Sequence, residues 1–193
     1  MSPRTSSKNE EIRKESMQKI MNAAFSLIAQ NGYESTSISQ IAAEAGISKG
    51  LLYNYYESKE DLLQKLVLNA VAQGDEIVND LVVDDPAATL ENMFRWFFKE
   101  MQERPDYWRL MTELTFKIDK FSFVQDMAKE KMVGYTSFFT GILEELKFPN
   151  AAQEAKLIGA IFDGIAIQSI VIKKDYPFDE MEAFLINKYC RKN

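Results

Sequence analysis

Apolar residues recur every three to four positions along most of the chain, the spacing of an α-helix with one buried face. No segment alternates apolar and polar residues at the period of a β-strand. The pattern predicts helices over residues 10–30, 37–45, 49–55, 59–81, 86–103, 106–118, 121–147, 151–174 and from 179 toward the C-terminus. The predicted fold class is therefore all-α.

Caps and helix breakers predict the helix ends. Asn31-Gly32 ends the first helix, and the polar residues 1–8 before it are predicted to be a flexible arm. Asn150 and Asp179 are predicted to cap the last two helices. The clearest boundary is Asp84-Asp85-Pro86, where cap residues precede a proline at the first helical position.

The most informative stretch is residues 36–63, TSISQIAAEAGISKGLLYNYYESKEDLL. Ser37 and Gln40 have the spacing of a capping box. Gly46 stands where a helix would end in the left-handed conformation, and Ser48 can cap a second short helix. Two short helices joined by such a turn form a helix-turn-helix, whose second helix enters the DNA major groove.

The run AAEAGISKGLLYNYYESKEDLL also resembles the DNA-binding signature of TetR-type transcriptional regulators, and the resemblance covers about residues 10–70. It implies three parts: an arm and DNA-binding domain at 1–58, a connecting helix at 59–84, and an effector-binding and dimerisation domain at 85–193. It also implies a dimer formed through the last two long helices.

Side chains that face outward when Leu52 packs inward are predicted to read DNA. A lysine suits guanine acceptors or a phosphate, an asparagine suits adenine, and a leucine suits a thymine methyl. Leu51 departs from the small or hydroxyl residue common in the family, so no base preference transfers. The predicted DNA-contacting set is Thr36, Ser37, Ser48, Lys49, Gly50, Leu51, Tyr53, Asn54, Tyr55 and Lys59. The alternative is that these residues are simply solvated surface.

Within that set, the resemblance implies phosphate contacts for Tyr53 and Tyr55, and it makes Lys59 a clamp on the DNA backbone. A lysine in the first turn of a helix is disfavoured by the helix dipole, and a phosphate would offset that. The alternative for Lys59 is a local pair with neighbouring carboxylates. Tyr56 matches a buried aromatic of the family and is predicted to lie in the core.

Large apolar side chains are frequent after residue 85, where they predict either a plain helical core or an aromatic-lined ligand pocket between helices. The candidate pocket residues are Phe94, Phe97, Trp108, Met111, Tyr135, Phe138, Phe139 and Phe162. The expected effector is a small apolar or aromatic molecule.

The helix expected over 151–174 is apolar around most of its surface and contains glycines. Together with the last helix, it is predicted to form a two-fold four-helix interface, and the alternative is a central helix within one subunit. The candidate interface residues are Leu157, Ile161, Gly164, Ile165, Ile170, Phe184, Leu185 and Tyr189.

Composition narrows the function classes. The 193 residues contain no histidine, which excludes imidazole-based zinc sites and Ser-His or Cys-His nucleophiles, and no cofactor or metal is expected. The single cysteine, Cys190, excludes an internal disulfide framework and fits a reducing cytoplasm. No apolar run reaches the roughly 18 residues of a membrane span, and no signal peptide is present.

The net charge of −6 at first argues against DNA binding. Residues 1–65, however, hold eight Lys/Arg and eight Asp/Glu, so the whole negative balance lies in residues 66–193. Affinity for DNA depends on local phosphate contacts rather than on global charge. We therefore predict a cytoplasmic, homodimeric repressor that binds a palindromic operator in double-stranded DNA and is released by a ligand. The alternatives are a constitutive or architectural DNA-binding protein and, with no supporting motif, a carboxylate-based enzyme.

Overall fold

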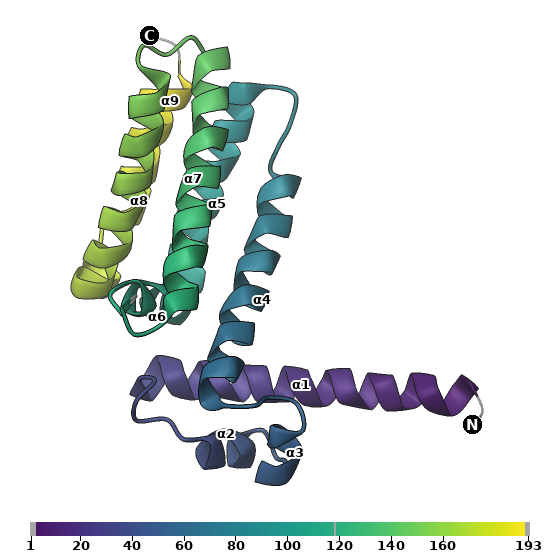
Figure 1. The fold of residues 1–193 in the computed structure, drawn as a ribbon. Coiled ribbons are helices and arrows are strands. Elements are labelled where there is room, and N and C mark those ends of the chain that lie inside the picture. Colours follow the sequence, from purple (N-terminus) through teal and green to yellow (C-terminus); the bar gives the residue numbers. More distant parts are fainter. Residues whose placement is uncertain (1–2, 118, 192–193) are drawn as a thin grey trace. The chain divides into compact units, whose positions relative to one another are not determined.

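The structure, a computed structural model, describes residues 3–117 and 119–191, with side chains described from residue 8 onward. Within these residues it consists of helices and short connections, without a strand, so the predicted all-α class is confirmed (Figure 1). The α-helices are α1 (Pro3–Asn31), α2 (Ile38–Glu44), α3 (Lys49–Tyr53), α4 (Lys59–Asp80), α5 (Pro86–Glu103), α6 (Pro105–Thr115), α7 (Ser122–Glu145), α8 (Ala151–Ile172) and α9 (Phe178–Cys190). A short 3₁₀ turn, Lys173–Asp175, follows α8.

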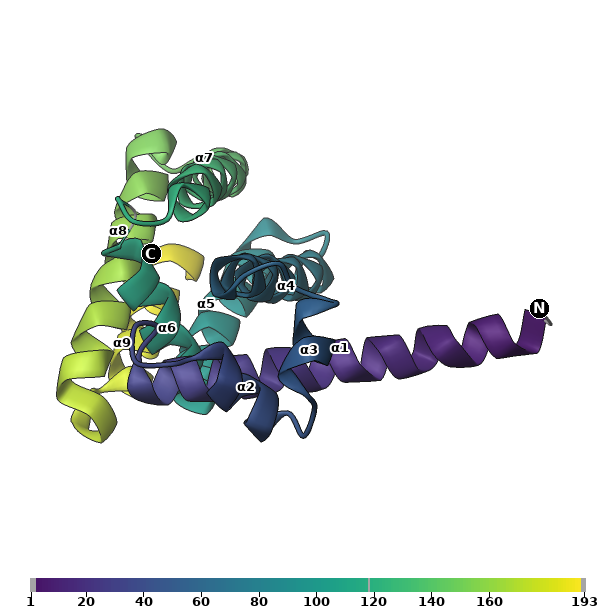
Figure 2. The ribbon, with the colours of Figure 1, turned by 60° about the horizontal axis from the view of Figure 1, so that its bottom comes forward.

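The chain folds into two compact units that divide inside α4, between Ala72 and Gln73. The helix predicted to connect the two domains at 59–84 is therefore shared between the units. In the N-terminal unit, α2 and α3 lie along one side of α1 (Figure 2). Its core consists of fully buried side chains from all four helices: Ile20, Ala24, Ile41, Leu52, Leu62, Leu63 and Val67.

Helix α1 begins at Pro3, so the prediction of a flexible arm over residues 1–8 is wrong from Pro3 onward, and residues 1–2 lie outside the described residues. Proline suits the first turn of a helix because its missing N–H would have no intrahelical partner there. No breaker follows until Gly32, whose φ of 81° is left-handed and whose N–H donates to Ile28 O at 2.8 Å. Helix propagation along this polar stretch is cheap once the first turn exists.

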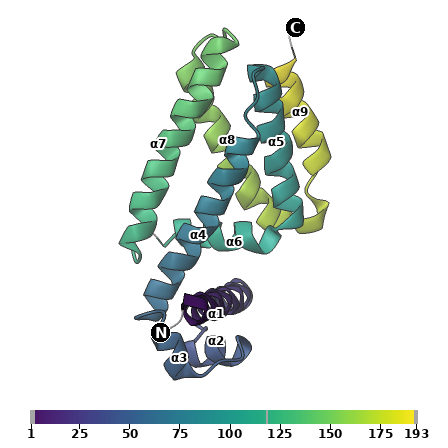
Figure 3. The ribbon, with the colours of Figure 1, turned by 90° about the vertical axis from the view of Figure 1, so that its right-hand side faces the viewer.

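In the C-terminal unit, α5, α7, α8 and α9 run alongside one another, and α6 crosses one end of them (Figures 1 and 3). Their shared core is rich in aromatic residues. The Phe97 and Phe162 rings are stacked with centroids 4.0 Å apart, and Phe94 meets Phe162 edge-on at 5.9 Å. Buried apolar residues of α8 and α9, among them Ile158 and Leu185, complete the core.

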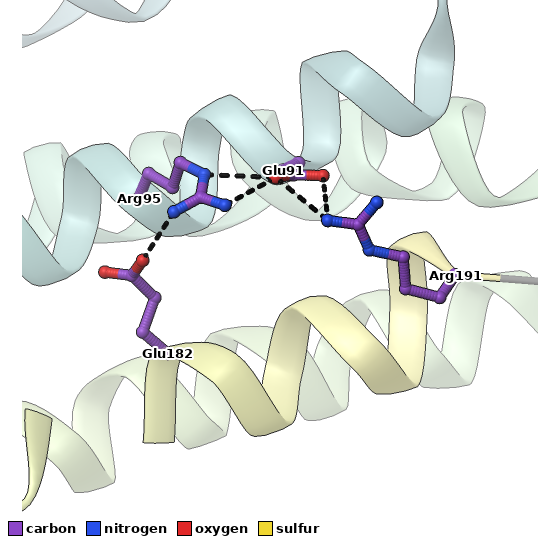
Figure 4. A network of polar contacts seen from close by, with 4 residues as sticks. All are labelled: Glu91, Arg95, Glu182 and Arg191. Atoms are coloured by element: carbon purple, nitrogen blue, oxygen red, sulfur yellow. Dashed lines mark hydrogen bonds and ion pairs between the residues drawn. The ribbon is translucent and has the colours of Figure 1, made fainter. Parts of the chain in front are cut away.

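A charged network joins α5 to α9 on the surface of this bundle (Figure 4). Glu91 accepts hydrogen bonds from Arg95 at 2.7 and 3.1 Å and from Arg191 at 3.4 Å. Arg95 also donates to Glu182 at 3.0 Å. Two of these contacts, Arg95 with Glu182 and Arg191 with Glu91, cross between α5 and the C-terminal segment that contains α9, whereas the Arg95–Glu91 pair lies within α5.

The side chains of Asn150 and Asp179, which were predicted to cap α8 and α9, make no capping hydrogen bond. Asn150 precedes α8 in the left-handed conformation, with φ 59°, and its side chain makes no capping bond. Helix α9 begins at Phe178 directly after Pro177, one residue before the predicted cap Asp179. Asn150 is tolerated there because asparagine enters the left-handed region more readily than most residues. The predicted cap Asp85 is confirmed, since its carboxylate accepts from Ala87 N at 3.0 Å, and Ser58 Oγ accepts from Asp61 N at 3.0 Å at the start of α4.

Helix α8 and the turn after it, Ala151–Asp175, are long and apolar enough to cross a membrane by length and composition alone, with a mean hydropathy of 1.7. This differs from the sequence-based expectation because Asp163 and Gln168 divide the segment into shorter apolar stretches. Only 22% of the most apolar 18-residue stretch of this segment is buried in the bundle, so apolar residues of α8 also face outward.

Candidate nucleic-acid interface

The turn between α2 and α3 has the predicted construction. Ser37 Oγ accepts from Gln40 N at 3.2 Å while Gln40 Oε1 accepts from Ser37 N at 2.8 Å, which confirms the capping box. Gly46 has a φ of 68°, and Ser48 Oγ accepts from Leu51 N at 3.1 Å. Helix α3 then spans only Lys49–Tyr53, shorter than the predicted 49–55. Local hydrogen bonds therefore hold both short helices in place.

Helix α3 presents a polar and aromatic face to solvent because Leu52 is fully buried beneath it. Lys49, Gly50 and Asn54 are exposed, Tyr53 is 48% exposed, and Leu51 and Tyr55 are half-buried. The Lys49 ammonium lies 5.9 Å from the centre of the Tyr53 ring. This face has the donors and apolar contacts that base edges and phosphates recognise.

Packing does not require a glycine at position 50. A Cβ built on Gly50 would meet only the Ser48 hydroxyl, at 4.0 Å, and the backbone is helical there. The absent side chain instead leaves the backbone at the start of α3 open to close approach by a large partner.

Thr36 does not belong to the exposed set. Its side chain is 2% exposed, and its hydroxyl oxygen lies 2.9 Å from Gly32 O and 3.2 Å from Leu27 O, both acceptors for its single hydrogen. We therefore remove Thr36 from the predicted DNA contacts, because the hydroxyl ties the loop after α1 to that helix.

Lys59 has an internal role that the sequence did not reveal. Its ammonium donates to Tyr33 O and Thr36 O, both at 2.9 Å, and lies 4.1 Å from the centre of the Tyr33 ring. The alternative of a pair with Glu60 or Asp61 is wrong, since Asp61 instead pairs with Lys65 at 2.9 Å. Two of the three ammonium donors are used inside the unit, which leaves one for a phosphate.

Two further side chains complete this region. Tyr56 is buried as predicted, and burial, with Asp61 as a second cause, raises the pKa of its hydroxyl to about 12. Arg13 was not among the predicted DNA contacts: it comes from α1, and its guanidinium lies 5.8 Å from the centre of the Tyr55 ring. Forty-two positions separate Arg13 from Tyr55, so no local pattern could have linked them.

Most of the predicted ligand-pocket residues are core instead. Phe94, Phe97 and Phe139 are buried, and Phe162 and Trp108 pack against them through ring contacts of 4.0 to 6.1 Å. These rings pack on one another in stacked and edge-to-face arrangements within the bundle core. Met111 is half-buried, while Tyr135 is 40% exposed and donates to Asp75 at 3.3 Å.

A cavity of about 580 Å³ lies elsewhere in the C-terminal unit, between α7 and the segment that joins α4 to α5. Of the predicted pocket residues, only Phe138 lines it. The other lining residues are Val82, Val83, Asp84, Pro86, Thr89, Gly134, Ser137, Gly141, Ile142 and Glu145.

The predicted dimer surface divides into buried and outward residues. Ile165, Leu185 and Tyr189 are at most 3% exposed and belong to the core of their own subunit, which corrects their assignment. Leu157 is 47% and Phe184 60% exposed, while Ile161, Gly164 and Ile170 are half-buried. Sequence reasoning missed Ile167 and Val171, which are 42% and 74% exposed. Leu157, Ala160, Gly164, Ile167 and Val171 follow one face of α8 at helical spacing, and we call this set the outer α8 stripe.

The part of the chain that the structure describes contains no group of three or more His, Cys, Asp or Glu placed to hold a metal ion. The Cys190 thiol is half-buried, and burial with the nearby Glu91 raises its pKa to about 12, which keeps it protonated at neutral pH.

Comparison with known proteins agrees with the geometry. Residues 20–66 match the family model of bacterial regulatory proteins of the tetR family. A fatty acid metabolism regulator protein of Bacillus subtilis is 41% identical over 54 residues, which span 28% of each chain. An HTH-type transcriptional regulator of Lactococcus lactis is 28% identical over 69% of this chain and 74% of its own.

Among solved structures, the regulator FadR from Bacillus subtilis, in complex with stearoyl-CoA, superposes with a TM-score of 0.73. The superposition covers 90% of this chain and 97% of that one, at 18% identity, and it shows a common fold. These similar proteins are transcription regulators rather than enzymes.

Proposed function

We propose that this chain, which belongs to the TetR family of bacterial regulatory proteins, is a homodimeric, ligand-released repressor that acts on DNA in the cytoplasm. In a dimer, two copies of α3 would enter successive major grooves of a palindromic operator, about 34–36 Å apart. The observation that carries the proposal is the exposed face of α3, held by the caps Ser37 and Ser48 and backed by buried Leu52.

The proposed DNA-contacting residues act in two ways. Lys49 and Asn54 have the donors that read base edges, and Gly50 lets the backbone come close. Tyr53 and Tyr55 direct hydroxyls toward phosphates, and the remaining N–H of Lys59 reaches another. Arg13, beside Tyr55, brings an additional cation from α1 to the same edge of the site.

The outer α8 stripe supports the dimer. Its exposed apolar residues repeat along one face of a 22-residue helix, and Phe184 of α9 adds an aromatic side chain that is 60% exposed. Ala160 and Gly164 lie among them, and small residues let two helices approach closely. Burying such a surface against its two-fold copy gives a closed, self-complementary interface.

Release by a small molecule requires a ligand with different affinities for the DNA-bound and DNA-free arrangements. The FadR structure of similar fold holds an acyl-CoA, which supports an effector with a large apolar part. Helix α4 begins in the DNA-binding unit and ends beside the 580 Å³ cavity, so a ligand there would act on the helix that both units share. The competing proposal is a constitutive regulator that needs no effector.

Selection of bound sequences from a random DNA library, followed by affinity measurements on the selected site, tests the proposal. We expect a palindrome whose half-sites are one helical turn apart. Lys49→Ala should weaken binding and reduce the salt dependence by about one unit if the lysine meets a phosphate. Lys129→Ala, on α7 in the other unit, is the matched control. Selection of no common sequence would overturn the proposed operator binding.

Sedimentation of interface variants tests the dimer. Ile167→Asp places a carboxylate in the outer α8 stripe and should yield folded monomers with little operator affinity. Lys129→Asp, an exposed change of charge on α7, should leave the dimer intact. A dimer that survives Ile167→Asp would exclude this interface.

A further inference from the structure

The 580 Å³ cavity beside α7 has the dimensions of a small-molecule site. Its walls come from the segment that joins α4 to α5 with the first turn of α5, and from one face of α7. Figure 1 shows where these helices and the segment lie in the C-terminal unit. Apolar side chains line most of it, with Val82, Pro86, Phe138 and Ile142 among them. We call this space the α7 groove.

The first wall is rigid because side chains of α5 hold the connecting segment in place. Thr89 Oγ1 accepts from Val83 N and donates to Val83 O, both at 3.0 Å, and is itself buried. Asn92 Nδ2 donates to Leu81 O at 3.2 Å. These bonds place Val82 and Val83 with 48% and 46% of their surface still exposed. The wall is therefore formed before any ligand arrives, which lowers the entropic cost of binding.

The second wall is open because α7 carries small residues there. Gly134, Ser137 and Gly141 lie on the same side of the helix. A Cβ built on Gly134 or Gly141 meets no atom within 4 Å, so these glycines are not required for close helix packing. Glycine costs about 1 kcal/mol against alanine inside a helix, and space for a ligand would justify that cost.

The charges that line the groove have one sign. Asp84 and Glu145 are its ionisable residues, both are exposed, and neither forms an ion pair with any residue that the structure describes. Glu145 is also the last residue of α7, where the helix dipole is negative and disfavours a carboxylate. A bound cation would offset both effects, whereas an anion would be repelled.

From this combination we infer that the α7 groove binds a small organic cation with an apolar body. The inference rests on the proposed function for its regulatory meaning, since it names the charge class of the effector. The apolar body contacts Val82, Phe138 and Ile142, and the positive charge lies near Asp84 and Glu145. Because the connecting segment follows α4 directly, a molecule in the groove bears on the end of that helix.

Titration calorimetry with tetraphenylphosphonium and tetraphenylborate tests the charge class, since the two ions have nearly the same shape and opposite charge. We expect the cation to bind the full-length protein and the anion to bind at least tenfold more weakly. Equal binding of the two ions, or preference for the anion, would overturn the inference.

Matched variants locate the site. Asp84→Asn and Glu145→Gln should each weaken the cation roughly fivefold, as expected for loss of one partly solvated charge at contact distance. Glu144→Gln, its neighbour outside the groove lining, should have no effect. Gly141→Leu should fill the space and abolish binding, while Gly159→Leu on α8 should not. Binding that persists in Gly141→Leu, with the helical circular dichroism spectrum unchanged, would place the cation elsewhere and refute the site.

Cation binding to the protein and cation-induced release of DNA are measured separately. If the cation binds with the expected charge and variant dependence, the groove assignment holds whatever happens to DNA. Adding the same cation to a complex with the selected operator then tests release. Undiminished operator binding at saturating cation would overturn its role as an effector and leave the binding site established.

Discussion

The N-terminal and C-terminal units differ in the contacts that stabilise each of them internally. In the N-terminal unit, hydrogen bonds from polar side chains to the backbone supplement the apolar core: Ser37 and Ser48 cap short helices, and Lys59 ties two carbonyls across the loop after α1. The C-terminal unit relies on ring packing, with Phe97 in contact with Phe98, Trp108 and Phe162. Directional bonds suit a small unit that must present one surface accurately.

The largest expected effect is a loss of stability in the C-terminal unit. Phe97→Ala removes a ring that is 3% exposed and contacts three other aromatic side chains, so unfolding should become easier by about 3–5 kcal/mol. Chemical denaturation followed by tryptophan fluorescence measures it, since Trp96 and Trp108 both lie in this unit. Phe116→Ala, which removes a ring that is 73% exposed, is the control and should change stability little. Similar losses in both variants would contradict the assignment of Phe97 to the core.

A smaller loss of stability is expected in the N-terminal unit when hydrogen bonds are removed but the apolar core is left intact. Lys59→Met keeps most of the stem but loses two hydrogen bonds to carbonyl oxygens, at a cost of about 1–3 kcal/mol. Hydrogen exchange of residues 33–36 should accelerate, because the carbonyls of Tyr33 and Thr36 lose their partner. Lys49→Met, whose ammonium is exposed, is the matched control. Unchanged exchange in Lys59→Met would show that the lysine serves DNA alone.

Removing the side-chain cap of α3 should reduce stability by less than either of these changes. Ser48→Ala deletes the oxygen that accepts from Leu51 N at 3.1 Å, and such losses amount to about 1 kcal/mol. Operator affinity should fall along with stability, since this cap sets the start of α3. Ser39→Ala, on the exposed side of α2, serves as the comparison. A full loss of affinity at unchanged stability would instead make Ser48 a direct DNA contact.

The effect that is smallest at neutral pH, and appears only in alkaline solution, concerns Tyr56. Tyr56 has a buried hydroxyl that lacks a hydrogen-bond partner among the described residues, and its pKa is raised from 10.0 to about 12. The folded state therefore keeps this proton when the unfolded state loses it, so stability should fall as the pH rises from 10 to 12. Tyr56→Phe should be neutral or slightly stabilising at pH 7 and should reduce that alkaline loss. Tyr53→Phe, altered at an exposed position, should leave the pH profile unchanged.

The helix-turn-helix could be read from the sequence because its determinants are local. Gly46 adopts the expected left-handed conformation, and the Ser37–Gln40 box forms between residues three apart. The role of Lys59 could not be read in this way, since its acceptors lie 23 and 26 positions away. For the same reason Thr36 seemed available to DNA, although its hydroxyl bonds back to α1.

In the C-terminal bundle, the helical period of apolar residues identified the helices, but it did not show which face of each helix is buried. Ile165 and Ile167 are equally apolar and two positions apart, yet one lies in the core and the other 42% exposed. Phe94, Phe97, Trp108 and Phe162, which were expected to line a pocket, pack on one another, whereas Phe138 lines the groove. Only the neighbouring helices decide whether a ring meets another ring or an open space.

The sequence by itself determined the all-α class and the helix-turn-helix, because helical period, caps and glycine turns act over three or four residues. Tertiary structure alone decided which apolar surfaces of α8 are buried and where the α7 groove opens. Burial depends on residues that approach from distant parts of the chain, and no local pattern records which helix will cover a given face.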